Sequence, residues 1–326
     1  MKVIFTKTEL KSKSKIREKL SDYISDFKEA SICYRENDIF NLVLSALRAN
    51  EWNIVDIEIS GNREKHIVDI ERITDWIEKK VVPNTIEIGP DETDLLKLMI
   101  FSLAMPYKML TGETRATMTE KVQRGNERYF GRIFSDIFDE KIGEIAFRKF
   151  AKQKFGRDIN LDWGISTEIS TFKSDIIDSK EIVSIKSTDT LESIWAEAPT
   201  TAEYGLFVKV ALPKDFFLKI LAHISIFFTD RGFSYHKLDD NLVENNNITD
   251  LVRFIEETAY GEKMAINGYI CGFFKVSEHN LKKKGEELPY LGEVHEDKHL
   301  IECNKIMYLD NEWDEFFINV LPLNNA

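Results

Sequence analysis

The spacing of apolar residues predicts a mixed α/β region in the first part of the chain. Apolar positions recur at helical spacing from Ile39 to Asn50, and Asp38 before them is a suitable helix cap. The segments TDWIEKKVV and LLKLMIFSLAM show the same periodicity, and Pro83 and Pro106 are expected to end them. WNIVDIEIS instead alternates apolar and polar residues, which is typical of a half-exposed strand.

The pattern changes twice in the remainder of the chain. Residues 111–155 have mainly helical spacing, with a break expected near Gly143. From Trp163 onward strands dominate, together with two helices, DLVRFIEETAY and WDEFFINVL. The order predicts an α/β (α+β) protein with a central mixed sheet flanked by helices. We expect an N-terminal α/β region over 1–110 and a second domain over 111–326. The predicted strands are STEISTF, KSDIID, EIVSIKST, EYGLFVKVAL, MAINGYICGFF and LIECNKIMYL.

Composition and charge narrow the possible classes of function. Hydrophobic residues at 43% and charged residues at 31% are typical of a folded globular chain. The net charge of −12 argues against a general polyanion binder, because phosphate binding requires a positive field. Lys108 to Arg157 is the exception, since 12 Lys and Arg there face 7 Asp and Glu. If the protein binds nucleic acid, we expect this stretch to make the contact.

Several other chemistries are not supported by motifs. The three cysteines form no CxxC pair, and the six histidines form no HxH or HExxH spacing. Phosphate-binding glycine loops and the serine-hydrolase GxSxG are also missing from the sequence. The first residues lack the apolar core of a signal peptide, and no run is long enough to span a bilayer. We therefore expect a cytoplasmic protein with no membrane partner.

The most informative stretch runs from Phe172 to Glu197. A two-residue turn at Ser179 and Lys180 would place Asp175 opposite Ser184 on the next strand. Directly opposed residues lie ~4.5–5.5 Å apart at Cβ, and strand side chains alternate, so Ser184 and Lys186 would share a face with Asp175. This geometry presents a carboxylate and an ammonium together. A metal-dependent phosphodiesterase needs both, one to hold Mg²⁺ and one to act on water and phosphate.

A basic stripe precedes this stretch. Its four residues recur at spacings that place them on one helical face, where they could contact a phosphate backbone. The alternative is a solvated face paired with Glu120 and Glu127. The stripe consists of Lys121, Arg124, Arg128 and Arg132.

The segment from Gly143 to Lys209 resembles the PD-(D/E)xK nuclease superfamily, especially restriction endonucleases with a degenerate second acid. The resemblance places Glu144 as the glutamate of an early helix and Asp175 as the strand-end aspartate, both holding Mg²⁺. Ser184-Ile185-Lys186 corresponds to the (D/E)xK half-motif. It implies that the main-chain carbonyl of Ile185 ligates the metal, that Lys186 orients the attacking water, and that the central sheet is restriction-endonuclease-like.

The chain departs from the family pattern at two points. Ser184 stands where Asp or Glu is usual, and no proline precedes Asp175. Some restriction enzymes with an SxK variant recover the missing carboxylate from a glutamate on the next helix, about a dozen residues beyond the lysine. Glu197, which lies 11 residues after Lys186, is the candidate for that relocated ligand, and Glu192 is the alternative.

The resemblance implies a magnesium-dependent type II restriction endonuclease that cuts double-stranded DNA. Residues 1–110 would serve DNA recognition or dimerisation, and 111–326 would form the nuclease domain with a C-terminal elaboration. Such an enzyme is expected to be a homodimer and to be accompanied by a cognate DNA methyltransferase. The alternatives are a repair-type or RNA-directed nuclease on the same core, or a catalytically silent DNA-binding protein in which the SxK motif is a relic. The expected catalytic residues are Asp175, Lys186, Glu144, Ser184 and Glu197.

Overall fold

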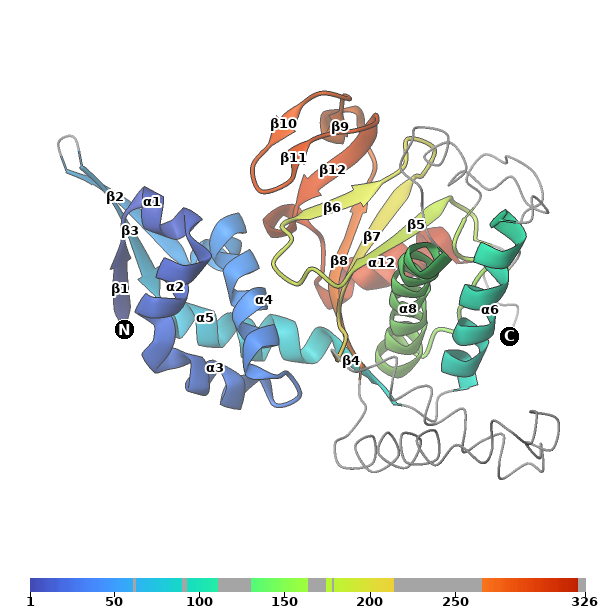
Figure 1. Ribbon diagram of the computed structural model, residues 1–326, viewed down its shortest axis with the longest axis horizontal. Helices are drawn as coiled ribbons and strands as arrows, with labels where there is room; N and C mark the ends of the chain where they lie inside the picture. Colours follow the sequence, from blue (N-terminus) through green and yellow to red (C-terminus); the bar gives the residue numbers. More distant parts are fainter. Residues whose placement is uncertain are drawn as a thin grey trace, which may run out of the picture.

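A computed structural model describes residues 1–60, 63–89, 93–110, 130–163, 174–177, 179–213 and 266–321 (Figure 1). These residues form helices and several sheets, and one sheet has both parallel and antiparallel strand pairs. The expected α+β class is therefore confirmed. An N-terminal helical region with a small sheet lies at one end of the molecule, and a larger sheet with its covering helices lies at the other (Figure 1). Within the described part, no helix has both the length and the apolar character needed to cross a membrane.

The N-terminal region is built around the buried helix α4 (Glu36–Ala49) and a three-stranded antiparallel sheet of order β1-β3-β2. The expected Asp38 cap is wrong, because α4 begins two residues earlier and Arg35 is its N-cap. Asp38 instead accepts a hydrogen bond from Arg35 Nε at 2.6 Å. The other elements are β1 (Lys2–Phe5), α1 (Lys7–Lys11), α2 (Lys13–Leu20), η1 (Ser21–Tyr23), α3 (Ile24–Ser31), η2 (Glu51–Asn53), β2 (Val55–Ser60), β3 (Arg63–Asp69), α5 (Ile70–Trp76), the π-helical turn η3 (Ile77–Val81) and η4 (Val82–Asn84).

The larger sheet has the order β4-β8-β7-β5, with β5 parallel to β7 and the other pairs antiparallel. Its strands are β4 (Thr85–Ile88), β5 (Val183–Thr188), β7 (Tyr204–Ala211) and β8 (Ile266–Lys275). Three helices, α6 (Thr93–Leu110), α8 (Phe130–Phe155) and α12 (Asp310–Val320), share one apolar core with this sheet. The smaller strands and turns are β6 (Trp195–Ala198), η5 (Glu278–Asn280), β9 (Leu281–Lys282), β10 (Glu287–Leu288), β11 (Gly292–Glu293), β12 (Lys298–Glu302) and η6 (Cys303–Lys305).

Helix α8 runs unbroken past Gly143, so the break predicted there is wrong. A Cβ at Gly143 would overlap Ser187 of β5, and one at Gly268 of β8 would overlap Ala146. The glycines therefore let the helix lie directly on the sheet rather than interrupting it. The Ser187 hydroxyl fixes this contact by donating to the main-chain carbonyl oxygens of Asp139 and Glu140.

Some predicted boundaries differ from the structure. α6 continues through Pro106 to Leu110, whereas the sequence indicated an end near the proline. KSDIID does not form a strand in its described residues, where Ile176 makes only an isolated bridge to Leu161. STEISTF and DLVRFIEETAY lie outside the described residues. β4 pairs with β8, and α6 contacts α8, so residues 85–110 join the larger sheet rather than the N-terminal region.

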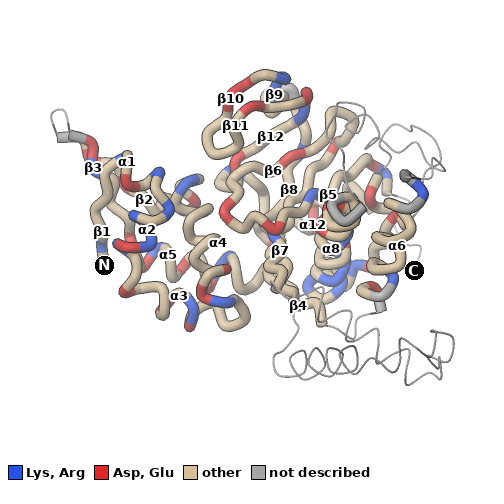
Figure 2. The backbone as a smooth tube through the Cα atoms, viewed as in Figure 1, with Lys and Arg blue, Asp and Glu red and all other residues tan. Residues whose placement is uncertain are grey.

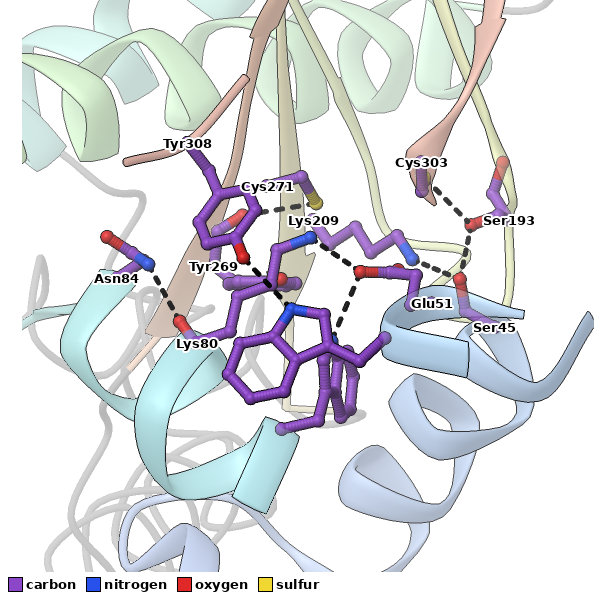
Figure 3. Close-up of polar contacts among 12 residues, drawn as sticks. Ser45, Glu51, Lys80, Asn84, Ser193, Lys209, Tyr269, Cys271, Cys303 and Tyr308 are labelled. Atoms are coloured by element: carbon purple, nitrogen blue, oxygen red, sulfur yellow. Dashed lines mark hydrogen bonds and ion pairs between the residues drawn. The ribbon is translucent and has the colours of Figure 1, made fainter. Parts of the chain in front are cut away.

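A buried polar cluster joins the two parts of the molecule (Figure 3). Glu51 receives Lys80 Nζ at 2.6 Å and Trp76 Nε1 at 3.1 Å. Lys209, on β7, donates to Ser45 Oγ of α4 at 2.6 Å. Apolar residues of the N-terminal region and of the sheet form one continuous core around this cluster. We call Glu51, Lys80 and Lys209 the interior cluster; each is at most 2% exposed.

Candidate active site at the outer edge of β5

Asp175 is held against the end strand of the larger sheet. Its main-chain N–H donates to the Val183 carbonyl at 3.0 Å, and its carboxylate Oδ2 accepts from the Ile185 N–H at 2.7 Å. The carboxylate thus takes the place that a neighbouring strand's carbonyl would occupy. Because the N–H and C=O of one strand residue point toward the same edge, the Ile185 carbonyl also faces Asp175. The predicted proximity of residue 175 to the SxK strand is present without the regular hairpin.

Glu144 approaches the same edge from α8 and is only 3% exposed. Its Oε2 lies 2.7 Å from Lys141 Nζ, one helical turn earlier. Lys141 Nζ also donates to the Asp162 carbonyl oxygen at 2.6 Å. α8 approaches β5 closely at Gly143, the residue before Glu144. The Asp175 charge acts on this buried carboxylate and raises its pKa.

Lys186 completes the group from β5. Its Nζ lies 3.4 Å from Glu140 Oε1 on α8, and the lysine side chain is 28% exposed. Glu140 and Glu144 are four residues apart and share a helix face, so both project toward β5. The structure therefore brings together Asp175, Glu144 and Lys186, which the sequence singled out, and adds Glu140 and Lys141. We call these five residues the edge cluster.

The pKa values show that the edge cluster is electrostatically strained. Burial, and then the nearby Asp175 charge, raises the pKa of Glu144 well above its ordinary value, and Lys141 offsets only part of this. Burial also raises the pKa of Asp175, although Lys186 and the Ile185 N–H act in the opposite direction. Glu140 raises the pKa of Lys186, with a further contribution from Asp175, so the lysine keeps its charge. Carboxylates crowded in a partly dry site in this way are characteristic of functional sites.

The remaining predicted site residues have other surroundings. Ser184 is fully buried, and its Oγ has no hydrogen-bond partner among the described residues. Glu197 lies on strand β6 and not on a helix, so the expected helical placement is wrong; it pairs with Lys298 Nζ at 2.6 Å. Its charge still contributes to raising the pKa of Lys186. Glu192 lies 3.1 Å from Lys13 Nζ and 3.2 Å from Arg48 Nη1.

The predicted DNA-binding stripe cannot be placed on the structure. Lys121, Arg124 and Arg128 lie outside the described residues, and only the main chain of Arg132 is described, in the first turn of α8. The basic residues that Figure 2 shows toward the other end of α8 are a different set. That set forms ion pairs within the protein: Arg148 with Asp94, Lys152 with Asp158 and Lys154 with Asp310.

The donors at the edge cluster are compatible with a magnesium ion. Magnesium is usually bound in proteins through one or two carboxylates, with water completing its octahedron. Asp175 and Glu144 supply two carboxylates, and the Ile185 carbonyl is a third oxygen at the same edge. In the part of the chain that is described, no three His, Cys, Asp or Glu side chains come close enough to hold an ion together. A metal here would therefore depend on main-chain oxygen and water.

Sequence reasoning missed Glu140, Lys141 and the packing role of Gly143. The spacing of Glu140 and Glu144 was a usable signal, because residues four apart in a helix lie on one face. The same spacing rule covers the pair of Lys141 with Glu144, three residues later, but not the contact of Lys141 with the Asp162 carbonyl, which comes from a distant segment. No family model matches the sequence, and neither a curated protein nor a solved structure is significantly similar to it.

Proposed function

We propose that the protein is a magnesium-dependent endonuclease that hydrolyses phosphodiester bonds of double-stranded DNA, in the manner of a type II restriction endonuclease. The observation that carries this proposal is the meeting of Asp175, Glu144 and Lys186 at one strand edge. Their arrangement combines a buried and a half-buried carboxylate, which favour a divalent cation, with an ammonium that stays charged. On this basis we also propose a restriction-endonuclease-like core and a homodimer that cuts both strands.

Asp175, Glu144 and the Ile185 carbonyl would hold the magnesium ion. When bound, the metal supplies Lewis-acid stabilisation of the phosphate and lowers the pKa of a bound water. The chain's own contribution is electrostatic. Lys186 would orient the attacking water and stabilise the negative charge that develops on the phosphate oxygens. Because the Lys186 pKa is raised, we assign this lysine to charge stabilisation and not to proton removal.

The decisive experiment measures cleavage of supercoiled plasmid DNA by the full chain in Mg²⁺. Lys186→Ala should lower the cleavage rate by ~100-fold or more, which is the usual effect of removing one transition-state contact. Lys180→Ala is the matched control, because Lys180 is an exposed turn lysine whose Nζ donates only to the Ile318 carbonyl in the described structure. It should cleave like the unchanged protein.

The substrates separate this proposal from its alternatives. Discrete plasmid fragments support a site-specific enzyme. Cleavage confined to nicked, flapped or RNA substrates would instead indicate a repair-type or RNA-directed nuclease. DNA binding with no cleavage in Mg²⁺ or Mn²⁺, together with identical behaviour of Lys186→Ala, would overturn the nuclease proposal.

A further inference from the structure

We propose that Lys141 is the resident counter-ion of the edge cluster and sets how tightly the site binds a divalent cation. The Lys141 ammonium pairs directly with Glu144, so a metal cation must displace the lysine or share the carboxylate with it. The inference rests on the proposed function, because it assumes that Asp175 and Glu144 receive the ion. It concerns a residue that the nuclease resemblance does not include.

Lys141 is held firmly in this position. Its side chain is 12% exposed, and its Nζ reaches Glu144 Oε2 at 2.7 Å and the Asp162 carbonyl oxygen at 2.6 Å. The ammonium also lies 5.6 Å from the Phe101 ring centroid and 5.7 Å from that of Trp163, within the range of cation–π attraction. Contacts from α6, α8 and the segment after α8 therefore form a cage around one positive charge.

The position of the Lys141 ammonium next to Glu144 determines how it affects metal binding. Glu144 and Asp175 are close enough for their charges to interact unfavourably, and Lys141 is the cation bound directly to Glu144. A divalent ion bound between the two carboxylates would meet the lysine's positive charge at short range in a largely dry environment. Like charges repel strongly there, since little water screens them. The lysine thus stabilises the metal-free protein and weakens metal binding.

The same arrangement suggests where Lys141 moves. The Asp162 carbonyl and the faces of Phe101 and Trp163 can retain the ammonium when Glu144 releases it. Metal entry would then require only a short displacement of one long side chain. This differs from Lys186, whose partner Glu140 is more exposed, at 45% of its side chain, and is not one of the two proposed ligands.

Binding of Mn²⁺ to the metal-free full chain, followed by electron paramagnetic resonance without DNA, tests the inference independently of cleavage. Lys141→Met should bind Mn²⁺ about 10-fold more tightly or better, because a neighbouring charge shifts the ionisation of a carboxylate by ~1–3 pKa units. Lys141→Arg keeps the charge and should bind like the unchanged protein. Lys152→Met removes an exposed lysine of the same helix and should also have no effect.

Unchanged or weaker Mn²⁺ binding by a folded Lys141→Met protein would overturn the inference. If that variant does not fold, the ¹⁵N signal of the Lys141 ammonium in the unchanged protein gives the answer. It should shift as Mg²⁺ is added, and a constant signal while Mg²⁺ binds would also overturn the proposal. If cleavage depends on Lys186 but neither Lys141 test shows an effect, this inference alone is refuted. Absence of both metal binding and cleavage would refute the proposed function with it.

Discussion

The interior cluster and the edge cluster are both built from lysines and acids and each contains a buried glutamate, yet their electrostatics are opposite. In the interior cluster, burial alone would raise the pKa of Glu51, but Lys80 and Lys209 more than offset it and leave that pKa below its ordinary value. In the edge cluster, burial and Asp175 leave the pKa of Glu144 well above its ordinary value. One carboxylate is thus fully compensated by cations, and the other is not.

The difference lies in the balance of charges. The interior cluster sets one carboxylate against two ammonium groups, whereas the edge cluster sets Glu140, Glu144 and Asp175 against Lys141 and Lys186. Compensated buried ions hold two parts of a protein together. Surplus carboxylates at a strand edge favour a cation that the chain itself does not supply. On this comparison we propose that the first cluster is structural and that the second carries the chemistry.

Breaking the interior cluster should have the largest effect on stability. Lys80→Met removes the cation from a pair whose side chains are 3% and 2% exposed, and it should lower the free energy of unfolding by about 3–5 kcal/mol. The physical reason is that buried Glu51 loses its direct ion-pair partner and keeps only the more distant charge of Lys209 and the Trp76 hydrogen bond. Urea unfolding measures this loss of stability. Lys79→Met is the matched control, since that neighbouring lysine is 60% exposed and its pair with Asp75 should contribute under ~1 kcal/mol. Equal losses in the two variants would contradict the comparison.

Removing an acid from the edge cluster should act in the opposite direction. Asp175→Asn keeps an acceptor for the Ile185 N–H but removes the charge that opposes ionisation of Glu144. We expect the free energy of unfolding to rise by about 1 kcal/mol, as is common when a functional site is relieved of strain, while DNA cleavage is lost. Urea unfolding at neutral pH checks the first effect. A loss of several kcal/mol would mean that Asp175 is a structural residue like Glu51.

The pH dependence of the free energy of unfolding should also differ between a carboxylate whose pKa is raised and one whose pKa is lowered, and this effect should be smaller. Burial, and then Asp189 and Asp136, raises the pKa of Asp139 on α8 to about 7, from an ordinary value of 3.8. The folded state therefore holds this proton more tightly than the unfolded chain does, and its contribution to stability declines as pH rises from 3.8 to about 7. Asp139→Asn should flatten that decline in urea unfolding between those pH values. For Glu51 the sign is reversed, because its lowered pKa makes stability fall below its ordinary pKa of 4.5. If Asp139→Asn leaves the slope of the unfolding free energy against pH unchanged, the raised pKa of Asp139 is contradicted.

Much of the fold was predictable because local periodicity determines it. β2, β7, β8 and α12 formed where alternation or helical spacing indicated them. The errors arose where contacts distant in sequence decided the outcome. Gly143 looked like a helix break, but it is the residue that lets α8 lie on Ser187. Glu197 looked like a helical residue, but it pairs with Leu300 of β12 in a sheet.

The amino-acid sequence by itself determined the strand that carries Lys186 and the helix that carries Glu144 to within a few residues, because local alternation and helical spacing indicate both. The strand predicted around Asp175 did not form in its described residues. Only the tertiary structure decided which charges surround them. Glu140 and Lys141 are ordinary surface-type residues in a helical pattern, and they became part of the edge cluster because α8 crosses β5 closely at Gly143. Electrostatic strain depends on distances and burial, which a linear pattern does not contain.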